Sequence, residues 1–109
     1  AGSLSRNDIV LTTRGTLGNS LLIDDKFPLP ARINSGMVIL HSSNKIIPRY
    51  LLYFFESANF RQQVLALQSG AAQPQLPIKD LQKMEIPVLN FNEQQHIVNT
   101  ISFLLLKSL

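Results

Sequence analysis

The spacing of apolar residues changes near Ile47, and this change limits what the chain can fold into. Before Ile47, short β-branched and apolar runs are separated by glycine and proline, a pattern typical of strands and turns. After it, Tyr50, Phe54 and Ala58 recur at the spacing of a buried helix face. Strands followed by helices predict an α+β fold, in which short mixed β-strands, partly β-helix-like, pack against helices.

The N-terminal part of the chain predicts a β-hairpin. Residues 8–15 are largely β-branched and apolar, and a second apolar run follows at residues 21–23. Gly15 and Gly18 bracket the stretch between these runs, as expected of a tight turn. The two runs are therefore expected to pair with each other.

Two further strands are expected around Gly36, at residues 31–34 and 37–41, with a bend or bulge at residues 35–36. The preceding Phe-Pro-Leu-Pro sequence, at residues 27–30, cannot supply the backbone donors of a continuous ladder, because proline has no N–H. That segment is expected to lie at an edge or to form a crossover.

The middle of the chain predicts helical structure. Pro48 suits a first helical turn, where its missing N–H matters least, and the helical spacing stops near Gly70. We expect this segment to form either one helix or two helices with a bend near residues 57–59. In the second case Asn59 could cap the second helix.

The segment after Gly70 predicts short elements only. Residues 79–83 predict one helical turn, and residues 84–89 predict a short strand. Pro87 interrupts that strand, so a place at the edge of a sheet, or at the strand's end, is expected.

A C-terminal helix is predicted after Asn92, which would cap it, and Glu93 suits the positive end of the helix. The apolar stripe of this helix is too wide for one small domain to cover, which predicts a fragment of a longer protein and a homo-oligomer of the isolated chain. Coiled-coil or helix-pair packing is favoured over a membrane span, which needs about 20 apolar residues. The residues assigned to this packing are Ile97, Val98, Ile101, Leu104 and Leu105.

Composition limits the class of protein. With 109 residues, of which 45% are apolar, the chain is expected to form one small globular unit, and its charge of +3 permits a polyanionic partner without requiring one. The absence of cysteine excludes disulfides and thiolate metal sites and fits a reducing cytoplasm. Residues 1–3 are small and polar, and we expect them to be a remnant of cloning outside the fold.

No pattern in the sequence predicts catalysis. His41 and His96 are far apart and lack the spacing of a zinc site, so they are expected at a strand end and on a helix surface. Residues 15–18 lack the Gly-Lys-Ser/Thr ending of a nucleotide-binding loop, which favours a hairpin turn. We therefore expect no catalytic residue, no metal and no cofactor.

Arginine and glutamine side chains are the candidate ligand contacts. Arg14, at a strand end beside a glycine, could hold a phosphate or a guanine edge, or could simply be solvated. Gln73 and Gln75 lie in a loop of small residues, where each amide could contact an adenine edge or cap the loop's own backbone. Arg32 and Lys45 would add positive charge, although surface solvation is the favoured role for either one alone.

Several motifs occur in an order that resembles a known family. They are Asp-Ile-Val-Leu with Thr-Arg-Gly-Thr in residues 8–16, Ser-Gly-Ala-Ala-Gln-Pro-Gln-Leu at 69–76, Met-Glu-Ile-Pro-Val at 84–88 and Glu-Gln-Gln-His-Ile-Val at 93–98. Together they resemble the end of a target-recognition domain in the DNA specificity subunit of type I restriction-modification systems. In that family a glycine usually stands where this chain has Asn7.

The resemblance implies recognition of double-stranded DNA on behalf of methyltransferase and restriction subunits, which carry the catalysis. Residues 4–91 would form part of a target-recognition domain, and residues 92–109 would begin a conserved spacer helix. It also implies a cytoplasmic protein that is neither an enzyme itself nor a membrane protein. The residues assigned to DNA binding are Thr13, Arg14, Gly15, Thr16, Arg32, Lys45, Gln73 and Gln75.

Two other interpretations are open from the sequence. The same domain could be the specificity segment of a fused restriction-methylation enzyme, which flanking sequence would reveal. Alternatively, it could be a protein-interaction module that dimerises through its helix and has no DNA role, which salt-sensitive DNA binding would contradict.

Overall fold

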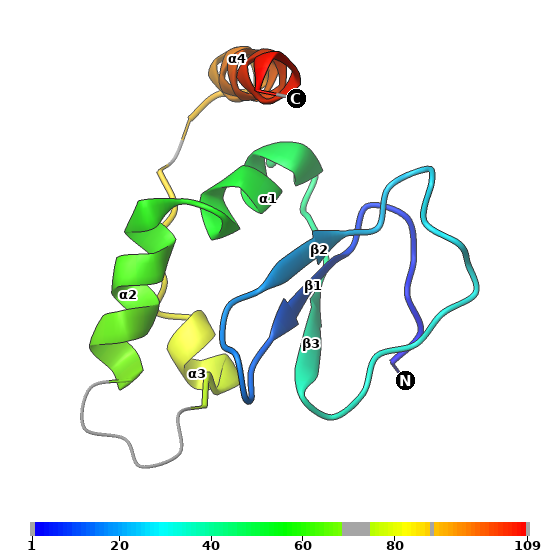
Figure 1. Cartoon of the computed structure of the whole chain (residues 1–109), viewed down its shortest axis with the longest axis vertical. Helices are drawn as coiled ribbons and strands as arrows, with labels where there is room; N and C mark the ends of the chain where they lie inside the picture. The colour runs from blue at the N-terminus through cyan, green and yellow to red at the C-terminus, as the bar shows by residue number, and fades with distance from the viewer. Residues whose placement is uncertain (1, 69–74, 88, 109) are drawn as a thin grey trace.

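The computed structural model describes residues 2–68, 75–87 and 89–108, and it has the α+β fold that the apolar spacing predicts (Figure 1). No helix in these ranges is long and apolar enough to cross a membrane. The strands are β1 (Ile9–Thr12), β2 (Ser20–Leu22) and β3 (Met37–Leu40), and the helices are α1 (Pro48–Phe55), α2 (Ala58–Gln68), α3 (Ile78–Leu81) and α4 (Phe91–Lys107).

The sheet has the order β2-β1-β3, and β1 pairs antiparallel with both neighbours. Ile9 lies opposite Leu22 on one side and Leu40 on the other, so the predicted hairpin is confirmed. Both pairings in the described residues are antiparallel, whereas the sequence predicts mixed, partly β-helix-like strands.

The predicted strand at residues 31–34 is wrong. In the structure, only Arg32 makes a bridge there, to Ser3, and Ile33 donates its N–H to the carbonyl of Gly2 at 3.0 Å. The prolines at 28 and 30 flank this segment and remove backbone donors, which leaves too few for a longer ladder.

The hydrophobic core lies between the sheet and the helices. Ile9 and Leu11 of β1 are fully buried, and Leu11 packs in one cluster with Phe54 of α1 and Phe60 of α2. The ring of Phe55 also meets that of Phe60 edge-on, with 4.9 Å between the ring centroids. Because these side chains come from the sheet and from both helices, burying them fixes the hairpin against α1 and α2.

A bend divides the central helical segment into α1 and α2, in agreement with the two-helix alternative. Ser57 makes the bend, because its hydroxyl donates to the Phe54 carbonyl at 2.6 Å and accepts from the Phe60 N–H at 3.2 Å. Asn59, the predicted cap, instead lies within the first turn of α2 and accepts from the side chain of Gln63 at 2.7 Å. The spacing of apolar residues does not distinguish Ser57 from Asn59 as the residue at the bend, because the two are only two positions apart.

The predicted strand at residues 84–89 is also absent from the described part of that segment. The amide of Gln63 donates to the Glu85 carbonyl at 3.2 Å and accepts from the Glu85 N–H at 3.3 Å. One side chain of α2 thus occupies the backbone groups that a neighbouring strand would use, while Pro87 has no N–H to offer.

The start of α4 is fixed by a capping box. The Asn90 side chain accepts from the Glu93 N–H at 2.8 Å, and the Glu93 carboxylate accepts from the Asn90 N–H at 3.2 Å. The cap is therefore Asn90 and not the predicted Asn92, because both hydrogen bonds of the capping box join Asn90 to Glu93.

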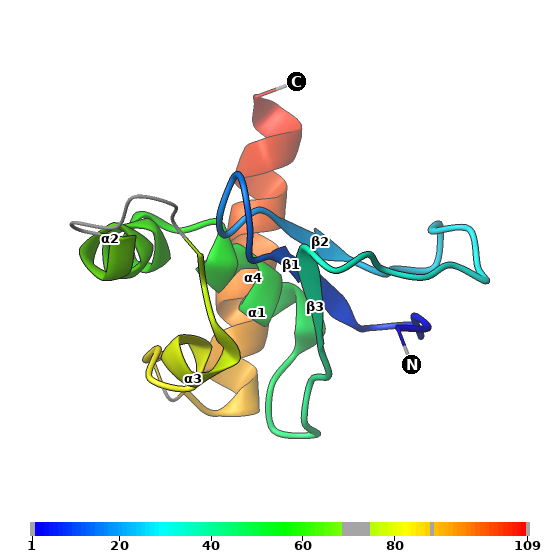
Figure 2. The same ribbon diagram turned by 90° about the horizontal axis from the view of Figure 1, so that it is seen from below.

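Gln94 connects α4 to the rest of the domain. Its side chain is buried, accepts from the Ile47 N–H at 2.8 Å, and donates to the carbonyls of Lys45 and Leu89 at 3.0 and 2.9 Å. Ile47 is the N-cap position of α1 and has no side-chain cap of its own, so Gln94 satisfies one of the orphan donors there. In Figure 2, α4 lies across α1, and its C-terminal turns extend beyond the rest of the chain.

Candidate nucleic-acid interface

The end of the molecule away from α4 carries the turn between β1 and β2, the start of β3 and α3 (Figure 1). Here the Thr13 N–H donates to the Gly36 carbonyl, and the Thr13 carbonyl accepts from the Leu76 N–H, both at 2.9 Å. Arg14 and Gln75, which are 61 positions apart in sequence, form an antiparallel bridge beside these bonds. The fold therefore places two of the candidate DNA contacts side by side.

The β1–β2 turn is held in shape by Thr12. Its hydroxyl donates to the Thr16 carbonyl at 2.6 Å and accepts from the Asn19 N–H at 2.9 Å. Gly15 and Gly18 have φ angles of 69° and 78°, a conformation that L side chains rarely adopt. Arg14, Gly15 and Thr16 are all exposed on this fixed turn.

An open pocket of about 200 Å³ lies beside Arg14 and Gln75. Its polar lining comes from Thr13, Arg14, Ser35 and Gln75, and its apolar lining from Met37, Val38, Leu76, Pro77 and Ile78. Ile78 is 62% exposed although it is a large apolar residue. A guanidinium, an amide and aliphatic carbon are the groups that contact guanine, adenine and the thymine methyl group in the major groove.

Ser35 and Ile78 were not among the residues assigned from the sequence. Ser35 is exposed in the turn that precedes β3, where the Gly36 N–H donates to the Asn34 side chain at 2.8 Å. Ile78 begins a helix of a single turn. Neither position has a motif of its own, and only the folding of β3 and α3 against β1 brings them to Arg14.

The other sequence-assigned DNA contacts are not gathered in this pocket. Arg32 lines a separate, mainly apolar cavity on the other side of the sheet, together with Val10, Phe27 and Ile33. Lys45 lines a third cavity, beside the first turn of α4. Gln73 lies outside the described residues.

The residues assigned to helix packing are exposed to different degrees. Val98 is buried at 7% exposure, and Ile97 and Ile101 are half-buried along a cavity that α4 shares with α1. Leu104 and Leu105 are 59% and 52% exposed. Two neighbours, Phe103 and Leu106, are exposed too, and we call residues 103–106 the apolar end of α4.

The titratable groups of the core have structural partners. Buried Asp8 accepts from the Ser5 N–H at 2.9 Å, and its other oxygen lies 2.6 Å from Nδ1 of His41, which is mostly exposed at the end of β3. Burial, and then the Glu93 carboxylate, raise the pKa of the Tyr50 phenol, which therefore stays protonated and donates to the Pro87 carbonyl at 3.2 Å. Among the described residues, no group of three or more histidine, cysteine or acidic side chains is placed to hold a metal ion.

Comparison with known proteins finds relatives over nearly the whole chain. Residues 3–107 match the family model described as the type I restriction modification DNA specificity domain. The specificity subunit of the type I restriction enzyme MjaIX from Methanocaldococcus jannaschii is 24% identical over 98 residues, which cover 90% of this chain and 22% of that subunit. The EcoR124I/EcoR124II specificity subunit from Escherichia coli is 27% identical over 92 residues, which cover 84% of this chain and 23% of that subunit.

A solved structure has a similar fold. It comes from a study of the complex assembly and conformational transition of the type I R-M system, and its chain superposes with a TM-score of 0.79 at 20% sequence identity. The match covers 98% of this chain and 25% of that one, and at this identity it concerns the fold alone. The chain thus spans about a quarter of the length of the relatives it matches.

Proposed function

Since the chain belongs to the family of type I restriction modification DNA specificity domains, we propose that it recognises the sequence of double-stranded DNA through the end that carries Arg14 and Gln75. The family match confirms the resemblance seen in the sequence. The observation that carries the proposal is the bridge between Arg14 and Gln75. It joins two of the three candidate base contacts next to an exposed, fixed turn.

The chemistry of this end suits the major groove. The Arg14 guanidinium can donate two parallel hydrogen bonds to guanine, and the Gln75 amide can donate to and accept from adenine. The side chains of Thr13 and Thr16 can donate to phosphate oxygens, which would fix the position of the turn on the duplex. Because the backbone of the turn is already ordered by Thr12, little conformational entropy would be lost on binding.

We further propose that this module is not catalytic, and that it directs methyltransferase and restriction subunits in the cytoplasm. In this proposal, residues 4–91 are part of a target-recognition domain, and α4 begins a spacer helix. The layout supports the division, because α4 and the Arg14 end lie on opposite sides of α1 (Figure 1).

The apolar end of α4 is proposed to pack on another helix. In the isolated chain that helix would come from a second copy, because leaving large apolar side chains in water forgoes about 1.5–3 kcal/mol each relative to full burial. The domain itself already covers much of Ile97, Val98 and Ile101. The contact between the two helices would therefore centre on Leu104 and Leu105.

The experiment that tests DNA recognition is selection from a random pool of duplex DNA at low salt, followed by affinity measurements with the enriched sequence. We expect Arg14→Ala and Gln75→Ala each to cost about 1–3 kcal/mol of binding free energy on that sequence and much less on a scrambled duplex. Lys107→Ala, which removes one positive charge from the far end of α4, is the matched control for net charge. A pool that yields no enriched sequence, or equal losses on both duplexes, would contradict sequence recognition by these residues.

A further inference from the structure

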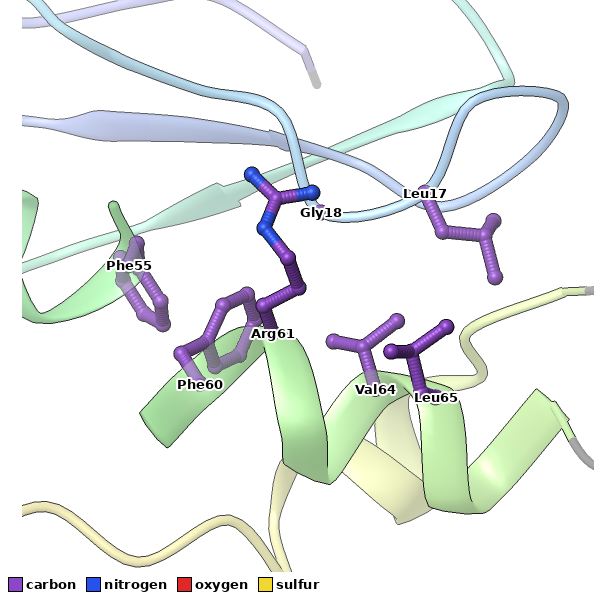
Figure 3. Close-up of a pocket in the computed structure, with 7 residues that line it drawn as sticks. All are labelled: Leu17, Gly18, Phe55, Phe60, Arg61, Val64 and Leu65. Carbon is purple, nitrogen blue, oxygen red and sulfur yellow. The ribbon is translucent and has the colours of Figure 1, made fainter. Parts of the chain in front are cut away.

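A second arginine stands on the other side of the β1–β2 turn from the pocket at Gln75. The turn packs directly on α2, where a Cβ atom built on Gly18 would lie 3.2 Å from Cε2 of Phe60. Arg61 follows Phe60 in α2 and is exposed. Figure 3 shows its guanidinium beside the turn at Gly18, above the rings of Phe55 and Phe60.

The arginines of this chain differ in whether their side chains have partners. Arg6 donates to the carbonyls of Asp24 and Phe27, Arg49 pairs with the Asp24 carboxylate at 3.7 Å, and Arg32 is engaged as well. Within the described residues, the side chains of the remaining two arginines make no hydrogen bond or ion pair. These two are Arg14 and Arg61, and they flank the same turn.

The segments that form this turn and α2 carry no acidic residue. No aspartate or glutamate occurs in residues 9–23, which include the hairpin, or in residues 57–79, which include α2 and the segment beside Arg14. The first acidic residue after this second range, Asp80, lies 4.0 Å from the Lys83 ammonium. Because neither guanidinium is paired with a carboxylate in the described residues, both charges are available to attract a polyanion.

We propose that Arg61 is a phosphate contact, so that the β1–β2 turn lies on the DNA with Arg61 at the phosphate backbone on one side and Arg14 at the base edges on the other. This inference rests on the proposed DNA recognition and adds a named residue of α2 to it. A guanidinium is suited to this role, because its planar donors match two phosphate oxygens. With the turn held in this way, the pocket beside Gln75 would keep a fixed position relative to the base edges.

The test is the salt dependence of binding to a fluorescently labelled duplex of mixed sequence, measured by anisotropy with the whole chain. Loss of one phosphate contact lowers the slope of log affinity against log salt by about 0.9, so the advantage of the wild type over Arg61→Ala should shrink about 3.5-fold between roughly 50 and 200 mM salt. Arg61→Lys keeps the charge and should keep most of the slope. Arg49→Ala removes the same charge elsewhere and should leave the slope unchanged.

The double variant Arg14→Ala, Arg61→Ala, measured on the enriched sequence, tests whether the two residues act separately. Separate base and phosphate contacts should combine the affinity loss of Arg14→Ala with the slope loss of about 0.9 from Arg61→Ala. A double variant that binds no more weakly than the single variants would overturn the arrangement with the turn between a base contact and a phosphate contact. An Arg61→Ala chain that binds like the wild type would overturn the role of Arg61 alone, whereas a wild-type chain that binds no DNA would overturn the proposed function as well.

Discussion

At the scale of single residues, positive φ angles identify the positions where the backbone restricts the side chain most. Asn7, Gly15 and Gly18 all have φ near 70–80°. Asn7 adopts this left-handed backbone although it is not glycine, and asparagine is one of the few residues that tolerate it. A Cβ atom built on Gly15 would have no heavy atom within 4 Å, whereas one built on Gly18 would lie 3.2 Å from the ring of Phe60.

This difference gives a paired prediction of stability. Gly15→Ala should lower the free energy of unfolding by about 1–2 kcal/mol, which is the cost of a left-handed residue with a side chain. Gly18→Ala should cost more, since its methyl group would lie 3.2 Å from Cε2 of Phe60 and the ring would have to shift by a few tenths of an ångström. Urea unfolding of both variants measures the difference, and equal losses would show that the contact with α2 is unimportant.

The sequence identified the candidate residues that belong to local motifs and missed those that only the fold brings together. The Thr-Arg-Gly-Thr motif marks Arg14 because a strand end followed by glycine can be read locally. Ile78 and Arg61 carry no such local mark. Ile78 lies in the same pocket as Arg14 because of where α3 packs. Arg61 lies beside the turn because Gly18 of the turn packs on its neighbour Phe60.

At the scale of elements, the strand, helix and turn assignments that were right rest on strong local patterns. The hairpin has apolar strands around a glycine turn, and α1 begins with proline. The strand expected at residues 84–89 was wrong because periodicity says nothing about what pairs with a backbone. In the structure Gln63, a side chain 22 positions from Glu85, takes that role.

The attachment of α4 gives a prediction at this scale. Gln94→Glu keeps the shape of the side chain but replaces its donor by an oxygen that faces the carbonyls of Lys45 and Leu89. We expect a loss of about 2–4 kcal/mol in the free energy of unfolding at neutral pH, because a buried charge would face unpaired acceptors. Gln95→Glu is the matched control, since Gln95 is exposed and bonds only to Asn99 within the helix, at 2.8 Å.

The loss should depend on pH in a defined direction. Burial beside two carbonyl oxygens raises the folded-state pKa of the introduced carboxyl above its unfolded value of about 4.3. The Gln94→Glu variant should therefore be most stable, relative to the Gln95→Glu control, below about pH 4.3, where the carboxyl is neutral in both the folded and the unfolded state. It should lose that stability as pH rises through the folded-state pKa. Thermal unfolding from pH 4 to pH 8 measures this, and a pH-independent difference from Gln95→Glu would contradict the assigned hydrogen bonds.

At the scale of the whole molecule, the chain has two ends with different surfaces. One end presents the β1–β2 turn and the pocket at Gln75, and the other presents the apolar end of α4 (Figures 1 and 2). The sequence predicted the α+β class and an apolar C-terminal helix. It could not predict which of the helix's apolar residues the domain itself covers, because Ile97 and Leu104 look equivalent in spacing and differ only in their distance from α1.

Self-association is the prediction that belongs to this scale. The wild-type chain should associate in sedimentation experiments at tens of micromolar, where roughly 6–7 kcal/mol of association free energy becomes visible. The Leu104→Asp, Leu105→Asp double variant should be monomeric, because it places charges in the proposed contact. Leu65→Asp, at a residue of α2 that is 58% exposed, is the control and should associate like the wild type. A monomeric wild-type chain would contradict the prediction.

The hydrogen bonds of Gln94 also have a consequence for how the two ends influence each other. Because one side chain satisfies backbone groups of Lys45, Ile47 and Leu89, α4 cannot detach without breaking the hydrogen bond at the N-terminus of α1. α1 packs in turn on β2 and α2. A partner that binds only α4 will therefore slow amide hydrogen exchange in α1 and reduce protease cleavage of the domain, in proportion to the affinity with which it binds.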